Sequence, residues 1–179
     1  GVHSDHEHLH ALIEMAGDRG VEAVTHAFTD GRDTAPAIAD QYLADLAGVV
    51  EREGTGAVAT VSGRYHAMDR DENWERTRKA YDAIVNREAA HEAGTAIEAV
   101  EAAYDRDETD EFVEPTLVEG APALEDGDAV VTFNFRADRM RQLVRMLASI
   151  DPEWGFETDP PDVRVVTMTE YDERFDLPV

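Results

Sequence analysis

The sequence predicts an α/β fold, with a mainly parallel sheet flanked by helices in a single three-layer domain. Short apolar runs of strand length alternate with longer segments in which apolar residues recur at helical spacing. Strands that are separated by helices are joined by right-handed crossovers, so they are expected to run parallel. The chain has 179 residues and no cysteine, and this length allows a substantial core without disulfides.

The order of the elements follows from the same patterns. Helical spacing predicts helices at residues 7–16, 36–51, 72–85, 94–104 and 137–148. Apolar runs predict strands at residues 21–28, 57–61, 129–133 and 163–167, and a short extended piece at residues 112–118. Ser4 is expected to cap the first helix as the start of a capping box, and Gly17 and Gly20 mark its end.

Arginines gather in the loops that follow three of these strands. The loops are Asp30-Gly31-Arg32-Asp33, Gly63-Arg64-Tyr65-His66-Ala67-Met68-Asp69-Arg70 and Asn134-Phe135-Arg136-Ala137-Asp138-Arg139. Ligands bind beyond the carboxyl ends of parallel strands, so the three loops are expected at one binding edge. Residues 169–172 would lie there too, and so would residues 2–4 if a strand ended just before residue 1.

The charge of the chain narrows the class of ligand. It carries 40 acidic and 16 basic residues, a net charge of −24, which argues against DNA or RNA as a partner. A guanidinium cluster in such a chain locally reverses the sign of the electrostatic field. Because guanidinium groups bind carboxylate and phosphate bidentately, we expect a small dianion or trianion that carries both groups.

Composition also indicates the surroundings of the protein. Only one basic residue, Lys79, is a lysine, a skew that resembles proteins from a salt-loaded cytoplasm, where acidic surfaces stay hydrated. No apolar run approaches the ~18 residues of a membrane span, and no secretion signal is recognisable. We therefore expect a cytoplasmic protein that binds neither membrane nor nucleic acid.

Asp33 and His3 are the candidates for proton transfer. A carboxylate beside Arg32 should stay ionised, and Asp33 could act as a general base toward a substrate hydroxyl. Helix capping or a salt bridge to Arg32 explains Asp33 equally well. His3 precedes the first helix and lies at the expected binding edge. In the same way, Arg64 and Arg70 taken alone could belong to a surface ion-pair network.

Three further histidines lie at the start of the first predicted helix. His6 and His10 are four residues apart on one helical face, a spacing that suits zinc or manganese. An exposed helix start explains these two residues and His8 better, and we expect no metal to be bound by this chain.

Five segments of the chain together carry a family resemblance. They are Gly1-Val2-His3-Ser4, His26 to Thr34, Gly63 to Arg76, Asp110-Glu111-Phe112-Val113 and Asn134 to Arg139. These segments resemble the cofactor-independent (2,3-bisphosphoglycerate-independent) phosphoglycerate mutases. The resemblance covers nearly the whole chain and is most specific at Tyr65 to Asp71 with Trp74-Glu75-Arg76, and at Phe133 to Arg136 with Asp138 and Arg139.

The resemblance implies that residues 1–179 are the inserted substrate-binding, or phosphotransferase, domain of a two-domain enzyme. The alkaline-phosphatase-like domain, which in that family holds two metal ions, usually manganese, and a transiently phosphorylated serine, is absent. This chain alone is therefore expected to be inactive. In the whole enzyme, 3-phosphoglycerate would give its phosphoryl group to the serine, and the glycerate would turn and take it back as 2-phosphoglycerate.

By the same resemblance, seven residues hold the substrate: His3, Arg32, Asp33, Arg64, Arg70, Arg136 and Arg139. Asp33 and His3 would be the catalytic pair, with Asp33 transferring protons to and from the glycerate hydroxyls. The partners would be 3-phosphoglycerate, 2-phosphoglycerate and the alkaline-phosphatase-like domain, within a monomer. The chain departs from the family at Asp5, where many relatives have histidine, and in the turn at residues 34–36.

Two other interpretations remain open from the sequence. The chain could be a stand-alone binding module for a sugar phosphate or carboxylate, with the same arginine edge and no catalysis. It could also be a histidine-based metal protein that depends on His6 and His10.

Overall fold

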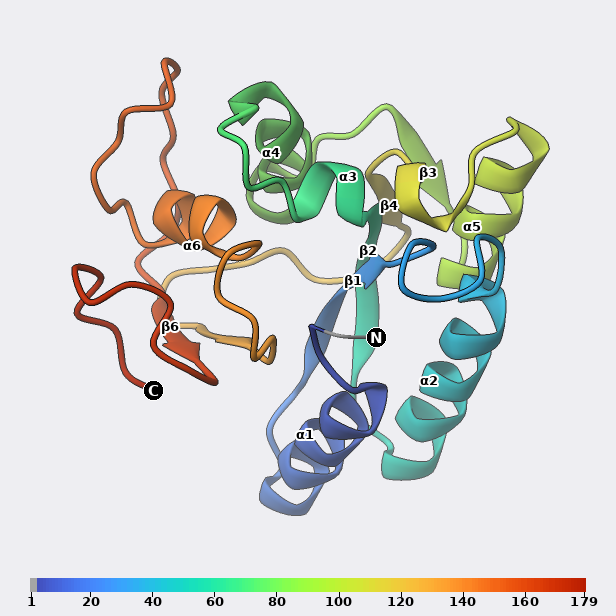
Figure 1. Ribbon diagram of the computed structural model, residues 1–179. Coiled ribbons are helices and arrows are strands. Elements are labelled where there is room, and N and C mark those ends of the chain that lie inside the picture. Colours follow the sequence, from blue (N-terminus) through green and yellow to red (C-terminus); the bar gives the residue numbers. More distant parts are fainter. Residues whose placement is uncertain (1–2) are drawn as a thin grey trace.

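The computed structural model describes residues 3–179 and contains two sheets, each accompanied by helices (Figure 1). The larger sheet has the strand order β1-β2-β4-β3. Its strands are β1 (Val24–Thr29), β2 (Ala57–Gly63), β3 (His91–Ala93) and β4 (Thr116–Val118). Strands β1 and β2 are parallel, as are β3 and β4, whereas β2 and β4 are antiparallel.

The second sheet pairs β5 (Ala129–Thr132) with β6 (Arg164–Thr167) in parallel. The helices are α1 (His6–Arg19), α2 (Ala39–Glu53), α3 (Arg64–Ala67), α4 (Trp74–Tyr81), α5 (Ala96–Asp105) and α6 (Arg141–Leu147). A π-helical turn, Asp82–Asn86, continues α4, and a 3-10 turn, Asp110–Phe112, precedes β4.

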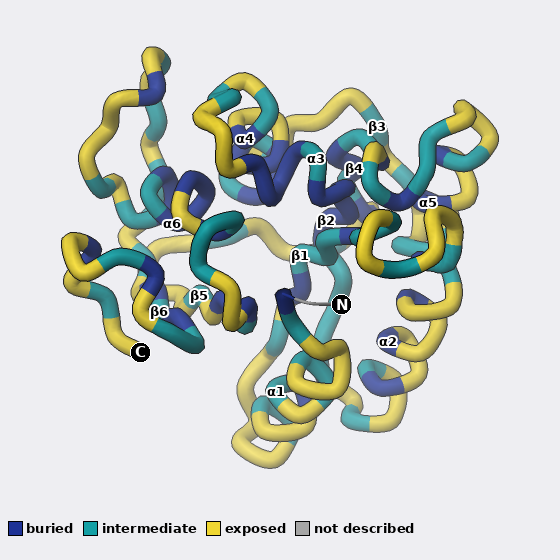
Figure 2. The backbone as a smooth tube through the Cα atoms, in the orientation of Figure 1, coloured by how far each residue is buried: buried dark blue, intermediate teal, exposed yellow. Residues whose placement is uncertain are grey.

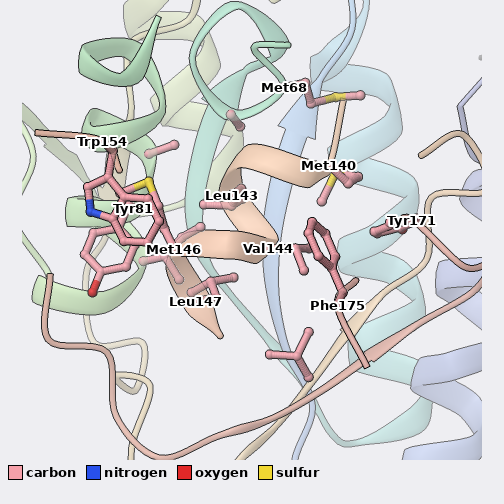
Figure 3. Close-up of a cluster of buried hydrophobic side chains, with 14 residues drawn as sticks. Met68, Tyr81, Met140, Leu143, Val144, Met146, Leu147, Trp154, Tyr171 and Phe175 are labelled. Atoms are coloured by element: carbon pink, nitrogen blue, oxygen red, sulfur yellow. The ribbon is translucent and has the colours of Figure 1, made fainter. Parts of the chain in front are cut away.

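Two apolar cores hold these elements together. One core joins α1, α2 and α5 to the larger sheet and is centred on Ile13, Leu46, Val61 and Val100. The other lies among α4, α6, β6 and the C-terminal segment, where Tyr81, Leu143, Met146, Trp154 and Phe175 meet (Figure 3). The outward faces of α1 and α2 are exposed, as the amphipathic spacing requires (Figure 2).

The predicted fold class is confirmed: the chain is an α/β protein with mainly parallel strands flanked by helices. The strands nevertheless divide between two sheets, and strand β3 was not predicted. The expected strand end before residue 1, and residues 1 and 2 of the matching N-terminal segment, lie outside the described residues.

The prediction that Ser4 caps the first helix is wrong. The N-cap is Asp5, which has extended backbone angles and whose carboxylate accepts a hydrogen bond from the Glu7 N–H at 3.1 Å. Both residue types cap well, so the pattern alone does not separate neighbours. The helix also continues past Gly17 to Arg19, because Gly20 takes the left-handed conformation that ends it.

Helices α2 and α6 begin several residues later than predicted. Helix α2 starts at residue 39 rather than 36, because the buried Asp110 carboxylate accepts hydrogen bonds from the backbone N–H groups of Ile38 and Ala39. Helix α6 starts at residue 141 rather than 137, so Asp138 and Arg139 lie in a loop. This loop connects β5 to α6.

Candidate anion-binding site

A tight turn after β1 positions the first acidic residues of the site. The Asp30 carboxylate accepts hydrogen bonds from the backbone N–H groups of Arg32 at 3.1 Å and Asp33 at 3.0 Å. Gly31 has a φ of 63°, and a Cβ at this position would lie 2.6 Å from the backbone nitrogen of Glu111. Glycine therefore allows the turn to pack closely against residues 110–111.

Arg64 is the centre of the site. It follows β2 directly, and its side chain is only 3% exposed. Its Nη1 donates to Asp30 Oδ1 at 2.6 Å and to Asp33 Oδ2 at 2.7 Å, while its Nη2 contacts His3 Nε2 at 3.2 Å. Burial opposes its charge, but the hydrogen bonds to Asp33 and Asp30 outweigh this and raise the pKa of Arg64.

His3 is held beside Arg64 as a neutral imidazole. Burial and the nearby charges of Arg64, Arg136 and Arg139 lower the pKa of His3. An arginine has no acceptor, so His3 Nε2 accepts the hydrogen bond from Arg64 and the ring proton lies on Nδ1. That Nδ1 is buried without a hydrogen-bond partner in residues 3–179. His3 therefore presents an unsatisfied N–H donor.

The backbone of His3 connects this centre to the third arginine loop. Its carbonyl accepts a hydrogen bond from the Phe135 N–H at 2.8 Å, and the Phe135 carbonyl accepts one from the Thr169 hydroxyl at 3.1 Å. The Tyr171 hydroxyl donates to the Asn134 carbonyl at 2.6 Å. These contacts fix the loop of residues 134–139 between the segment at His3 and the loop after β6.

Arg70 and Arg136 share one carboxylate. Arg70 Nη1 donates to Asp138 Oδ2 at 2.6 Å, and Arg136 Nε lies 3.1 Å from Asp138 Oδ1. Burial would raise the pKa of Asp138, but the hydrogen bond from Arg70 and the charge of Arg136 outweigh it and lower that pKa. Asp69 shapes the loop that carries Arg70 by accepting hydrogen bonds from the backbone N–H groups of Asp71 and Asn73.

Arg139 lies beside this group, and among residues 3–179 it forms no salt bridge with a carboxylate. Its Nη1 donates to the Met68 carbonyl at 2.9 Å, and within residues 3–179 its buried Nε has no hydrogen-bond partner. Burial and the charges of Arg64 and Arg70 lower the pKa of Arg139. An anion bound beside Arg139 would therefore stabilise its charged form.

Arg32 is the most exposed of the five arginines, at 61%, and pairs with Glu111 at 3.4 Å. The salt bridge considered between Arg32 and Asp33 is not what the structure contains, since Asp33 pairs with Arg64. Asp33 Oδ2 also lies 3.8 Å from His3 Nε2.

The structure thus brings the seven predicted residues to one edge. They lie close enough there for the charges of the arginines to shift the pKa values of His3 and Arg139. Sequence reasoning missed Asp30 and Asp138, the carboxylates that organise the arginines. Asp30 had a signal, because an Asp before Gly favours a turn in which its side chain binds the following N–H groups. Asp138 lies between Arg136 and Arg139 in sequence, but nothing there indicates that it pairs with Arg70.

Residues 1–173 match the family model described as BPG-independent PGAM N-terminus. The chain belongs to this family. The chain is 71% identical over 180 residues to the 2,3-bisphosphoglycerate-independent phosphoglycerate mutase of Natronomonas pharaonis, covering 100% of this chain and 36% of that protein. It is 46% identical over 182 residues to the protein of the same name from Clostridium perfringens, covering 98% of this chain and 35% of that protein.

A solved structure of a phosphoglycerate mutase from Leishmania mexicana, crystallised at low cobalt concentration, has a similar fold. The TM-score is 0.87 at 29% identity, over 96% of this chain and 34% of that one. The chain therefore spans about a third of the length of the mutases that it matches. The resemblance stated from the sequence is confirmed at the level of this N-terminal family.

The described residues contain no obvious metal site. Among residues 3–179, no group of three or more His, Cys, Asp or Glu side chains is placed to hold a metal ion. The rings of His6 and His10 pack edge to face with centroids 5.4 Å apart, and His6 lies 3.5 Å from Asp5. In the same part of the chain, no helix has the length and apolar character needed to cross a membrane.

Proposed function

We propose that this chain holds the glycerate part of the substrate in a 2,3-bisphosphoglycerate-independent phosphoglycerate mutase, which interconverts 3-phosphoglycerate and 2-phosphoglycerate. The observation that carries the proposal is the group of five arginines at one edge, centred on buried Arg64, in a chain of the BPG-independent PGAM N-terminus family. A stand-alone binding module is not favoured, because the chain corresponds to about a third of the length of proteins named as mutases.

The arginines suit a substrate whose reacting group moves. During the interconversion the phosphoryl group leaves one hydroxyl and joins the other, so the enzyme must hold the glycerate by a group that does not react. The carboxylate is that group, and guanidinium groups bind it bidentately. Arg70, Arg136 and Arg139 have N–H groups available for this contact. Positioning of this kind carries most of phosphoryl transfer.

Asp33 and His3 are placed to handle protons at the substrate hydroxyls. Asp33 is partly exposed, at 30%, and its Oδ2 is held by Arg64. We assign it the transfer of protons to and from the glycerate hydroxyls. Neutral His3 donates its free Nδ1–H to a substrate oxygen, because its Nε2 is already occupied by Arg64.

The metal ions and the phosphorylated serine are assigned to the part of the enzyme outside this chain. Residues 3–179 contain no group of potential ligands for two manganese ions. Manganese in the alkaline-phosphatase-like domain would activate the serine and polarise the phosphoryl oxygens. The residues of this chain would bind the glycerate, orient it and exclude water from it. Exclusion of water matters because hydrolysis of the phosphoserine would turn a mutase into a phosphatase.

The proposal extends to the setting of the enzyme. We propose a cytoplasmic monomer that serves glycolysis and gluconeogenesis in a salt-rich cell. The net charge of −24 and the single lysine support the salt-rich setting. So do relatives of 62–71% identity from the haloarchaea Haloquadratum walsbyi, Natronomonas pharaonis, Haloarcula marismortui and Halobacterium salinarum.

The direct test is the mutase activity of the full-length protein without added 2,3-bisphosphoglycerate. The 2-phosphoglycerate that forms is detected by its conversion with enolase. We expect conversion of 3-phosphoglycerate, and we expect Arg136→Ala to lower kcat/KM at least ~100-fold through the loss of a charged contact. The matched control is Arg52→Ala, which removes an exposed arginine paired with Glu53 and should leave activity unchanged. Absence of conversion by the wild-type protein would overturn the function, and near-normal turnover of Arg136→Ala would remove Arg136 from the site.

A further inference from the structure

Asp138 is held less firmly than Asp30 and Asp33, the other two aspartates of the arginine site. Asp30 accepts two backbone N–H groups as well as buried Arg64, and Asp33 is fixed by the same arginine. Asp138 receives one hydrogen bond, from Arg70, whose side chain is 41% exposed. Its Oδ1 lies 3.1 Å from Arg136 Nε but makes no hydrogen bond, although it is buried.

The charges of the site favour the displacement of one carboxylate from the arginines when substrate binds. Five arginines (Arg32, Arg64, Arg70, Arg136 and Arg139) face four carboxylates (Asp30, Asp33, Glu111 and Asp138), which leaves a net charge of +1. A phosphoglycerate carries roughly three negative charges near neutral pH, from its phosphate and carboxylate. With every carboxylate in place, the arginines are largely neutralised before the substrate arrives.

Asp138 lies between two arginines in the way that a bound anion would. Its carboxylate is the same chemical group as that of glycerate, and it lies between two arginines from different loops. The charge of Asp138 also acts on His3. It partly offsets the lowering of the His3 pKa by burial and by the arginines. Next to it, Arg139 has a buried Nε without a partner in residues 3–179.

We propose that Asp138 is an internal stand-in for the anionic group of the substrate. Without substrate it holds Arg70 and Arg136 together and reduces the repulsion between them. When substrate binds, its carboxylate or phosphate replaces Asp138 as the acceptor of the hydrogen bond from Arg70, and the Asp138 side chain moves away. Asp138 thereby sets how tightly the arginine site binds anions. This inference rests on the proposed function for the identity of the substrate, but anion binding itself can be measured without turnover.

The test compares the full-length wild-type protein with Asp138→Asn, which keeps the shape of the side chain and removes its charge. We expect the KM for 3-phosphoglycerate to fall at least ~3-fold. The dissociation constant for inorganic sulfate, measured by calorimetric titration at constant ionic strength, should fall by a similar factor. The matched control is Asp82→Asn, which removes the carboxylate of the Arg78–Asp82 pair on another surface and should change neither constant.

The possible outcomes separate this inference from the proposed function. If both constants rise or stay the same in Asp138→Asn, Asp138 is a scaffold for the arginines and the inference is wrong. If the wild-type protein shows no mutase activity, the proposed function fails, while the sulfate titration still decides the role of Asp138. If the variant does not fold, a crystal structure of the wild-type protein with 3-phosphoglycerate decides it. An intact Arg70–Asp138 hydrogen bond in that complex would contradict the inference, and its replacement by a substrate contact would support it.

Discussion

At the scale of single residues, the site depends on partners that are far apart in the sequence. Arg64 joins Asp30 and Asp33, which lie 34 and 31 residues earlier, and His3, which lies 61 residues earlier. Residue type and position after a strand could place Arg64 at the binding edge. They could not show that it is buried at 3% exposure, or that two carboxylates hold it. Long-range pairing of this kind has no local signature.

His26 makes stability depend on pH. It lies in β1, where its Nδ1 contacts the Thr60 hydroxyl at 2.9 Å, and burial together with the charge of Arg87 lowers the pKa of His26 to about 4. The unfolded chain takes up this proton below its ordinary pKa of about 6.5, while the folded chain does not. The free energy of unfolding should therefore decrease as the pH falls from about 6.5 to about 4, by about 3 kcal/mol from this residue.

The measurement is urea denaturation of the 179-residue chain at several pH values between 4 and 7. The variant His26→Gln should lose this part of the pH dependence, whatever its effect on stability at pH 7. The control His8→Gln, at an exposed position in α1, should keep the wild-type slope. An unchanged slope in His26→Gln would show that the folded chain does not hold His26 neutral over this pH range.

At the scale of elements, the sequence predicted which segments are regular better than where they begin. Periodicity placed α1, α2, α5, β1 and β2 correctly to within a few residues. It placed the start of α2 too early, because the carboxylate that accepts the first N–H groups of this helix belongs to Asp110, which is 71 residues away from Ala39. It also missed β3, which has three residues and includes the polar His91 and Glu92, so it lacks an apolar run.

The segment at residues 110–113 packs against Gly63 at the end of β2 and against Gly31 in the turn after β1. It therefore supports the loops that carry Asp30, Asp33 and Arg64. Gly63, the last residue of β2, donates its N–H to the Val113 carbonyl at 2.8 Å. A Cβ at Gly63 would lie 2.7 Å from the Val113 nitrogen and would also overlap the Glu111 carbonyl. We expect Gly63→Ala to reduce the free energy of unfolding by about 2 kcal/mol or more, because backbone atoms must move apart.

Chemical denaturation of the 179-residue chain measures this effect. The matched control is Gly48→Ala, at an exposed position in the middle of α2 where a Cβ would meet nothing within 4 Å. That substitution should stabilise the chain by up to about 1 kcal/mol, because alanine favours the helix. Equal effects of the two substitutions would contradict the close packing described for Gly63.

At the scale of the whole molecule, the sequence predicted the fold class but not the division into two sheets. The alternation of strands and helices is the same whether β5 and β6 join the larger sheet or form their own. The separation depends on the second apolar core around Leu143, Met146 and Trp154, whose contacts connect distant segments. The loop at residues 134–139, which connects β5 to α6, contacts His3 and Met68 and brings Arg136 to the same edge as Arg64.

The net charge of −24 should make the stability of the chain depend on salt. Carboxylates repel one another over about 10 Å at 0.1 M salt and over about 3 Å at 1 M. We expect the Tm of the 179-residue chain to rise by on the order of 10 °C between 0.1 M and 1 M potassium chloride, because screening removes this repulsion. Scanning calorimetry with sorbitol as an uncharged control measures it. A Tm that stays constant or falls would show that the acidic surface does not limit stability.

We expect the arginine edge of this chain to bind phosphoglycerate. The most direct measurement is an NMR titration of the isotope-labelled chain with 3-phosphoglycerate in 1 M potassium chloride, following arginine side-chain and backbone amide signals. We expect weak, millimolar binding, with shifts confined to His3, Arg64, Arg70, Arg136 and Arg139. Shifts at the opposite edge of the sheet, around Gly20 and Gly54, or the absence of shifts in a folded sample, would contradict the claim.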